Sequence, residues 1–324
     1  MGHETSTDTN AYAKHLDRST CLITGGAGFI GSNLARELIR NGASVRILDD
    51  LSTGSAASIP DGADFRCGTV ASESVVESAM EGVDFVFHLA ALVSVPKSVE
   101  QPVLNFESNV RGTFNIIQAA VRNHVRSLVH TSSAAVYGLS PKLPSSELDP
   151  IHCASPYAAA KAAGELMAQS AAHNHALHAV SLRLFNVFGC GQSASGGYAA
   201  AISAFVDAVT KGRPVNIFGD GKQTRDFVPV MNVVSAFVRA SDPHRPTAGM
   251  TFNIGMGTNI NLLEVLTMIA EIKGVRPVVD YRPARIGDVV HSSADIGRAR
   301  EFLGYSPSVS VERGMTQLLE SLSA

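Results

Sequence analysis

The first half of the chain alternates between short segments with strand character and longer segments with helical periodicity. The expected strands are residues 20–24, 44–48, 64–67, 83–89, 127–131 and 179–184. The expected helices between them are residues 29–41, 103–123 and 156–173. Most of these strands are apolar at nearly every position, which suits a parallel sheet covered by helices on both faces. The sequence therefore predicts an α/β fold built on a doubly wound parallel sheet.

Beyond residue 185 the alternation becomes irregular, with glycine-rich and proline-containing stretches between shorter elements. Helices are expected there at residues 199–211, 232–240, 262–273 and 311–322. Two later strands, residues 227–230 and 251–254, are expected to return to the first sheet. The predicted division is a first domain over residues 19–185 joined by 226–254, and a smaller α/β lobe over residues 186–225 and 255–324. The cleft between two such lobes is the usual place for a ligand.

Composition excludes several other classes of protein. The formal net charge of −3 gives no reason to expect nucleic acid or an anionic membrane as a partner. No apolar run reaches the roughly 18 residues of a membrane span, and residues 1–18 are polar and read as a loose leader. The four cysteines are far apart and match no metal-binding spacing, so we expect reduced thiols in a cytoplasmic protein without a metal.

A glycine-rich turn follows the first expected strand and opens the first expected helix. Its glycines are Gly25, Gly28 and Gly31, within the sequence Thr-Gly-Gly-Ala-Gly-Phe-Ile-Gly. Gly25 lets the chain turn, Gly28 lets the backbone approach a pyrophosphate, and Gly31 lets helix and sheet pack closely. The N-terminus of the helix then binds the phosphates. This context predicts that residues 19–185 form a Rossmann-like dinucleotide-binding domain.

An acidic residue at the end of the second expected strand indicates which dinucleotide binds. Asp49 lies 18 residues after Gly31, where a carboxylate can accept hydrogen bonds from an adenosine ribose and repel a 2′-phosphate. The cofactor is therefore predicted to be NAD. Asp50 is the competing candidate for this role. The hydroxyl and amide groups of the following Ser52, Thr53 and Gly54 can add contacts.

Tyr157 and Lys161 stand four residues apart in an expected helix and so share one face. A buried ammonium beside a phenol favours the phenolate, and we expect the pKa of Tyr157 to fall toward neutral pH. A hydroxyl at the end of the preceding strand, in the segment Thr131 to Gly138, can share the proton. Such an arrangement is suited to removing a proton from an alcohol. A tyrosine and a lysine at this spacing also occur in helices without any catalytic role.

Taken together and in their order, these motifs resemble the extended short-chain dehydrogenase/reductases. Within that family the chain is similar to the nucleotide-sugar epimerase/dehydratase group. The resemblance runs from about residue 20 to the C-terminus. It rests on residues 24–31, Asp49, residues 88–91, Asn109, residues 131–138, 157–161, 183–189, 218–227 and 285–292.

The resemblance implies a role for individual residues. Ser133, Tyr157 and Lys161 would be catalytic. The residues implied to bind NAD are Gly25, Gly28, Phe29, Ile30, Asp49, Leu89, Ala90, Ala91, Asn109, Tyr157 and Lys161. The residues implied to bind the nucleotide sugar are Val93, Ser94, Ser133, Tyr157, Asn186, Arg225, Arg285 and Asp288. Two arginines suit a diphosphate, because the guanidinium donors match its oxygens in a fork.

Two alanines after the catalytic serine narrow the implied reaction. Family dehydratases carry Asp-Glu directly after the catalytic hydroxyl residue, and decarboxylases carry a Glu in the same segment. This chain has Ala134 and Ala135 there, which cannot act as acid or base. The resemblance therefore implies an NAD-dependent 4-epimerase that oxidises C4 of a UDP-hexose and returns the hydride to the other face. A 4,6-dehydratase or UDP-glucuronate decarboxylase using acids from elsewhere is the alternative, and a non-catalytic NAD-binding sensor is a third.

The identity of the sugar stays open at this level. Residues 94–98 resemble a segment of epimerases that act on UDP-N-acetylhexosamines, and Ser292 stands where a bulky tyrosine in the family excludes an N-acetyl group. Lys97 could instead meet a uronate carboxylate. UDP-GlcNAc, UDP-Glc and UDP-glucuronate are all candidates. The helices 103–123 and 156–173 resemble those of the family's dimeric four-helix bundle, which implies a homodimer, although their apolar positions could also pack within one subunit.

Overall fold

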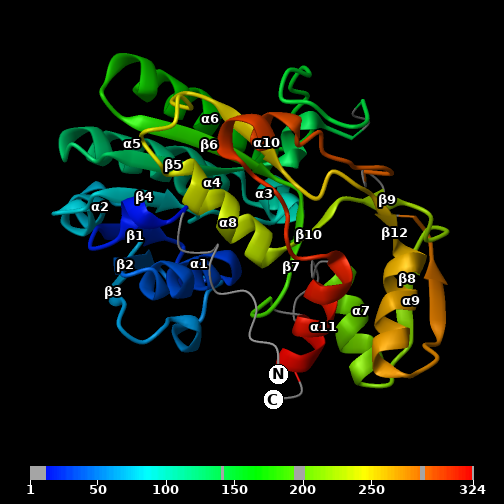
Figure 1. Cartoon of the computed structure of the whole chain (residues 1–324). Coiled ribbons are helices and arrows are strands. Elements are labelled where there is room, and N and C mark those ends of the chain that lie inside the picture. Colours follow the sequence, from blue (N-terminus) through cyan, green and yellow to red (C-terminus); the bar gives the residue numbers. More distant parts are fainter. Residues whose placement is uncertain (1–11, 140–141, 193–200, 285–288, 323–324) are drawn as a thin grey trace.

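The computed structural model describes residues 12–139, 142–192, 201–284 and 289–322 (Figure 1). Its centre is a seven-stranded sheet in the order β11-β6-β5-β4-β1-β2-β3, with every neighbouring pair parallel. The strands are β1 Thr20–Thr24, β2 Ser44–Asp49, β3 Asp64–Cys67, β4 Phe85–His88, β5 Ser127–Ser133, β6 His178–Leu184 and β11 Thr251–Ile254. Six of them follow the 3-2-1-4-5-6 order of dinucleotide-binding folds, and the predicted fold class is confirmed.

Helices cover both faces of this sheet because side chains along each strand alternate between two cores. In β1, Cys21 and Ile23 join the core beneath α1, α8 and α10, while Leu22 joins the core beneath α2, α5 and α6. The two-sided burial explains why the strands are apolar at successive positions. The covering helices are α1 Phe29–Arg40, α2 Glu73–Met80, α5 Gly112–Arg122, α6 Pro156–Asn174, α8 Val230–Ala240 and α10 Gly297–Leu303.

A third core forms the smaller lobe, which lies to one side of the sheet in Figure 1. Its helices are α7 Ala201–Thr210, α9 Leu262–Lys273 and α11 Val311–Ser321. Three two-stranded sheets complete it: β7 Asn186–Phe188 with β10 Phe227–Pro229, β9 Thr224–Arg225 with β12 Ile260–Asn261, and β8 Val215–Phe218 with β13 Val279–Arg282. In the described parts of the chain, no helix is long and apolar enough to cross a membrane.

Two expected elements differ from the structure. Residues 227–230 do not return to the main sheet: β10 pairs with β7, because β11 already occupies the edge beside β6. The expected helix over residues 103–123 is interrupted. It runs as α4 Pro102–Asn105, a π-helical segment η3 Phe106–Arg111, and then α5. The wider turn of a π segment shifts the side chains that follow it, and such segments often occur beside functional sites.

The expectation of a loose leader is wrong for residues 12–18. The short helix η1 Lys14–Leu16 packs against the main sheet, with Ala13 and Leu16 fully buried in the first core. The His15 ring is hydrogen-bonded to Ser241 at 2.9 Å, and Arg239 stacks over the Tyr12 ring. The segment is polar on average, so two buried apolar residues three positions apart left little signal in its composition.

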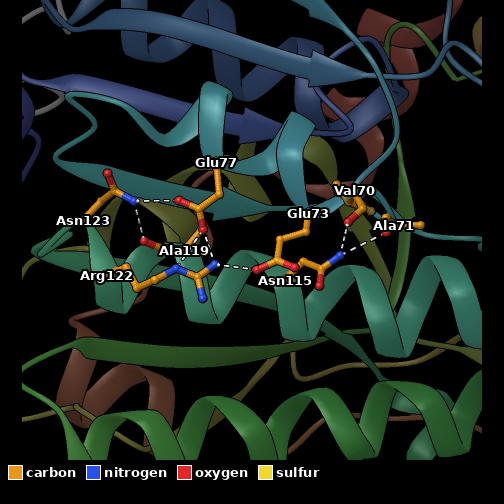
Figure 2. A network of polar contacts seen from close by, with 8 residues as sticks. All are labelled: Val70, Ala71, Glu73, Glu77, Asn115, Ala119, Arg122 and Asn123. Carbon is orange, nitrogen blue, oxygen red and sulfur yellow. Dashed lines mark hydrogen bonds and ion pairs between the residues drawn. The ribbon is translucent and has the colours of Figure 1, made fainter.

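Figure 2 shows the polar contacts that join α2 to α5 and fix the loop before α2. Arg122 forms ion pairs with Glu73 and Glu77, which tie the two helices together at the surface. The buried Asn115 amide donates to the carbonyl oxygens of Val70 at 3.0 Å and Ala71 at 3.1 Å. This contact matters for the site, because Val70 lines a cavity at the carboxyl edge of the sheet.

Docking of the N-terminal segment can be tested with Leu16→Ala. Leu16 is 0% exposed, and truncating a buried leucine should lower the free energy of unfolding by about 2–5 kcal/mol. Lys14→Ala is the control, since Lys14 is exposed in the same helix and should change stability by less than about 0.5 kcal/mol. Denaturant unfolding measures both. Equal stability of wild type and Leu16→Ala would contradict this docking and support the expectation of a loose leader.

Candidate active site

The glycine turn brings the backbone of three segments into close contact. Gly25 has a φ of +70°, and a Cβ there would lie 2.7 Å from the Ala90 nitrogen. A Cβ on Gly31 would overlap the Gly25 carbonyl oxygen, so that side chains are excluded at both ends of the turn. Gly28 precedes the first turn of α1 and has no capping side chain. The amide groups at this helix end are therefore accessible to an anion.

Asp49, the last residue of β2, stabilises the same turn by hydrogen bonds. One carboxylate oxygen accepts a hydrogen bond from the Ala27 nitrogen at 3.0 Å, and the other accepts from the Leu51 nitrogen at 2.8 Å. A carboxylate can accept about four hydrogen bonds, so acceptor positions remain for a ligand. Asp50, in contrast, is exposed and accepts from Ser52 at 2.9 Å.

Two adjoining cavities extend from the turn along the carboxyl edge of the sheet. The larger, of about 400 Å³, reaches the catalytic candidates, and the smaller, of about 120 Å³, lies over the ends of β2 and β3. Asp49, Thr53 and Ala91 line both. Of the other predicted cofactor residues, the larger cavity is lined by Gly25, Gly28, Phe29, Ile30, Leu89, Tyr157 and Lys161. The smaller is lined by Asp50, Ser52 and Ala90.

Two predicted cofactor residues lie behind the cavity walls. Gly54 packs against the glycine turn, and a Cβ there would come within 2.9 Å of the Ala27 backbone. The Asn109 amide accepts from the Leu92 nitrogen at 2.8 Å and donates to the Leu92 oxygen at 3.0 Å and to Asn105 at 2.8 Å. Because these bonds use both of its donors, Asn109 supports the segment that lines the cavity.

The catalytic candidates meet at one end of the larger cavity. Lys161 is buried and donates from Nζ to the Thr131 carbonyl oxygen at 2.8 Å, with Nζ 5.9 Å from the centre of the Tyr157 ring. The Ser133 hydroxyl interacts with the Tyr157 phenol and also accepts from the Ala135 nitrogen at 3.2 Å. The structure thus brings Ser133, Tyr157 and Lys161 together.

The expected fall in the pKa of Tyr157 is contradicted for this chain. Burial raises the pKa of the phenol, and the hydrogen bond with Ser133 opposes this only in part. Burial also lowers the pKa of Lys161 to about 8, while the negative charge of Glu165 acts in the opposite direction. The cause is general: the fold that brings the two groups together removes both of their charged forms from water.

The residues around the cavities fit a dinucleotide. Gly25 and Gly28 line the larger cavity beside the uncapped N-terminus of α1, which suits a pyrophosphate, and the Asp49 carboxylate lines both cavities, which suits a ribose. The buried Thr131 hydroxyl has no hydrogen-bond partner among the described residues, and Thr131 lines the larger cavity. It is therefore a further polar group for the nicotinamide half.

A third cavity, of about 470 Å³, lies between the main sheet and the smaller lobe. It shares Val93, Phe185 and Val187 with the larger cofactor cavity, so the two spaces meet beside the catalytic cluster. Asn186 and Arg225 line it, as predicted for substrate residues.

Val93, which lines both cavities, is also a predicted substrate residue, whereas Ser94 lines neither. Ser94 caps the short helix α3 Val95–Glu100, where its hydroxyl accepts from the Lys97 nitrogen at 3.2 Å. Arg285 and Asp288 fall outside the described residues, although Val289, Val290 and His291 line an adjoining cavity of about 240 Å³.

Several lining residues were missed by sequence reasoning. Gln192 lines the larger cofactor cavity, held by Ser203 at 2.7 Å and by the Val187 carbonyl oxygen at 3.1 Å. No signal in the sequence marked it. Phe218 and Gln223 line the substrate cavity, and both belong to the segment 218–227 that carried the family resemblance. That motif could have identified them.

The chain is similar to known proteins over most of its length. The family model "NAD dependent epimerase/dehydratase family" matches residues 21–255. A UDP-glucose 4-epimerase of Mycolicibacterium smegmatis is 39% identical over 306 residues, which cover 92% of this chain and 97% of that protein.

Solved structures of related epimerases are also similar. The UDP-glucose 4-epimerase of Thermus thermophilus in complex with NAD has a TM-score of 0.87 and 34% identity, covering 94% of this chain and 99% of that one. The UDP-N-acetylglucosamine 4-epimerase of Methanobrevibacter ruminantium has a TM-score of 0.90 and 30% identity, covering 95% and 99%. The family model spans well over half of the sequence, and the chain belongs to the NAD-dependent epimerase/dehydratase family that its motifs resemble.

Proposed function

We propose that the protein is an NAD-dependent UDP-sugar 4-epimerase, which inverts C4 of a UDP-hexose through a transient 4-keto intermediate. One observation carries the choice of reaction. The cofactor cavity and the substrate cavity meet beside Ser133, Tyr157 and Lys161, and Asp49 is the only carboxylate among their described lining residues. Asp49 lies at the turn, where its two oxygens bind backbone amides. The site therefore offers one acid–base group for one alcohol.

Each catalytic side chain has a distinct task in this proposal. Tyr157 takes the proton from O4 of the sugar, and Ser133, bonded to the phenol, orients or relays it. Lys161 binds the nicotinamide ribose and keeps a positive charge near the phenol. When bound, NAD would supply the hydride acceptor and donor for C4 and the positive charge of its oxidised ring. That charge favours the phenolate, which burial alone disfavours.

The fate of the keto sugar follows from what the site lacks. Ala134 and Ala135 form the start of the short helix η4 Ala134–Tyr137 directly after Ser133. A 4,6-dehydratase or a UDP-glucuronate decarboxylase needs a further acid or base here, and methyl side chains cannot supply one. Return of the hydride to the opposite face, with the diphosphate held in place, is the reaction that remains.

The substrate class is a UDP-hexose, and the relatives above act on UDP-glucose and on UDP-N-acetylglucosamine. Ser292 donates from its nitrogen to the Thr224 oxygen at 3.1 Å, beside Arg225, so a small residue stands near the substrate cavity. This supports room for an N-acetyl group. Lys97 lines the smaller cofactor cavity rather than the substrate cavity, which does not support a uronate contact. All three UDP-sugars belong in the assay.

We further propose that the protein is a homodimer in the cytoplasm. Exposed apolar side chains follow the outer faces of the α4–η3–α5 helix and of α6, including Val103, Phe114 and Leu166 at 73%, 51% and 62% exposure. A second copy would cover them, and we therefore include a homodimer. A cytoplasmic location is supported by four free thiols. The smaller lobe would bind the nucleoside diphosphate, and the main sheet would bind NAD.

The reaction is tested by offering the purified protein UDP-Glc, UDP-GlcNAc and UDP-glucuronate without added NAD. We expect inversion at C4 of at least one of them, because the cofactor is regenerated in each cycle and should remain bound. Tyr157→Phe should lower turnover by about a hundredfold or more while NAD stays bound. A stable keto product or released CO2 would support the alternative reactions, and no change with any of the three would reject the epimerase.

Asp49 and Asp50 can be separated by matched substitutions. Asp49→Asn keeps one acceptor oxygen for two backbone amides and a ribose, so we expect NAD affinity to fall roughly tenfold or more. Asp50→Asn is the control, since its exposed carboxylate should change affinity little. Calorimetric titration with NAD measures both. A larger loss with Asp50→Asn would reverse the assignment.

The homodimer is tested with Leu166→Glu, which places a charge on the proposed interface. We expect the molar mass from light scattering to fall to that of a monomer, because a buried unpaired carboxylate opposes association. Val278→Glu is the control, with Val278 67% exposed on the smaller lobe. A wild-type protein that is already monomeric, or a Leu166→Glu variant that stays dimeric, would contradict the proposed interface.

A further inference from the structure

A buried ion pair lies directly behind the catalytic cluster. The Arg183 guanidinium of β6 binds both oxygens of Glu165 on α6, with Nε–Oε1 at 2.9 Å and Nη2–Oε2 at 2.7 Å. Both side chains are 5% exposed. Neither residue lines one of the cavities described above, and the proposed reaction gives them no task.

The pair binds the chain on both sides of the catalytic serine. The Ser132 hydroxyl donates to Glu165 Oε1 at 2.5 Å, one residue before Ser133. Arg183 Nη1 donates to the Tyr137 hydroxyl at 2.9 Å, four residues after it. Ser133 itself accepts from the Ala135 nitrogen and so caps the short helix that ends at Tyr137. The segment between the two contacts is therefore held at each end.

The same pair is fixed to the helix that carries the other two catalytic groups. Tyr157, Lys161 and Glu165 follow one another at intervals of four residues on α6, on its buried side. Because Glu165 binds Ser132 and is covalently part of α6, it sets the position of the strand end relative to Tyr157. Tyr137 adds an anchor to β11, since its hydroxyl donates to Asn253 Oδ1 at 2.6 Å.

We propose that Glu165 and Arg183 are positioning residues for this reaction: through Ser132 and Tyr137 they hold the Ser133 hydroxyl against the Tyr157 phenol. The proposal rests on the 4-epimerase function proposed above. Stability alone is a weak reason for such a pair, because removing two charges from water costs as much as their attraction returns in many proteins. A network with defined bond directions does fix geometry.

Two substitutions release the segment around Ser133 at one end each without changing a catalytic group. Ser132→Ala removes the bond to Glu165, and Tyr137→Phe removes the bonds to Arg183 and Asn253. We expect kcat for UDP-hexose inversion to fall by roughly tenfold or more in each, because small displacements of reacting groups are costly. KM and the Kd for NAD should stay within about twofold of wild type, since the Ser132 hydroxyl is bonded to Glu165 and Tyr137 lines neither the cofactor nor the substrate cavity.

Tyr305→Phe is the matched control. Tyr305 is 1% exposed, and its hydroxyl donates to the Gly255 oxygen at 2.9 Å, so it loses a buried bond near β11 without any link to Ser133. Its kcat should equal that of wild type. Wild-type kcat in Ser132→Ala and Tyr137→Phe, or an equal loss in Tyr305→Phe, would overturn the proposal. If Tyr137→Phe fails to fold, the charge-free double variant Glu165→Gln/Arg183→Met replaces it, with the same expected loss of kcat.

A second measurement needs no turnover and so separates this proposal from the proposed function. Tyrosinate absorbance is titrated in wild type and in Ser132→Ala, each compared with the same protein carrying Tyr157→Phe. The Ser133 hydrogen bond lowers the pKa of Tyr157, and Ser132→Ala leaves the burial that raises this pKa in place. The pKa of Tyr157 should therefore rise in Ser132→Ala. An unchanged pKa would refute the positioning role, whereas a wild type without turnover would refute only the epimerase.

Discussion

The close approach of α6 to β5 is the contact on which the candidate site depends. A Cβ on Gly164 would overlap the His130 ring, so glycine at this position permits the approach. At that separation Lys161 reaches the Thr131 carbonyl oxygen at 2.8 Å, and Glu165 reaches the Ser132 hydroxyl at 2.5 Å. A helix displaced outward by a methyl group would lose both contacts together. The chemistry of the site thus depends on a steric constraint between a glycine and a buried ring.

Much of the fold could be predicted because its causes are local. Strands buried on both faces favour apolar residues at successive positions, as in Cys21, Leu22 and Ile23 of β1, Leu128 and Val129 of β5, and Ala179 and Val180 of β6. A side chain at Gly25 would overlap the backbone of Ala90, so the turn requires glycine there, and this requirement can be recognised in the sequence. Tyr157 and Lys161 were found for the same reason, since their spacing on one helix fixes their proximity.

The features that were missed depend on contacts distant in sequence. β10 pairs with β7 and not with the main sheet, because β11, a strand later in the chain, occupies the edge beside β6. Burial of Leu16 depends on its packing against residues of the first core that are distant in the sequence, which no local pattern reveals. The direction of the Tyr157 pKa depends on how completely the surrounding protein removes water. Spacing predicts which groups meet, but only tertiary packing determines the medium in which they meet.

The cofactor cavity and the substrate cavity have a common wall formed by Val93, Phe185 and Val187. Ligands in the two cavities would contact the same three side chains. The two binding free energies are therefore linked, and linkage is reciprocal: the factor by which NAD changes the affinity for a UDP-sugar equals the factor by which the sugar changes the affinity for NAD. In a protein that retains its dinucleotide through both hydride transfers, a UDP-sugar that raises the affinity for NAD through this wall is itself bound more tightly when NAD is present.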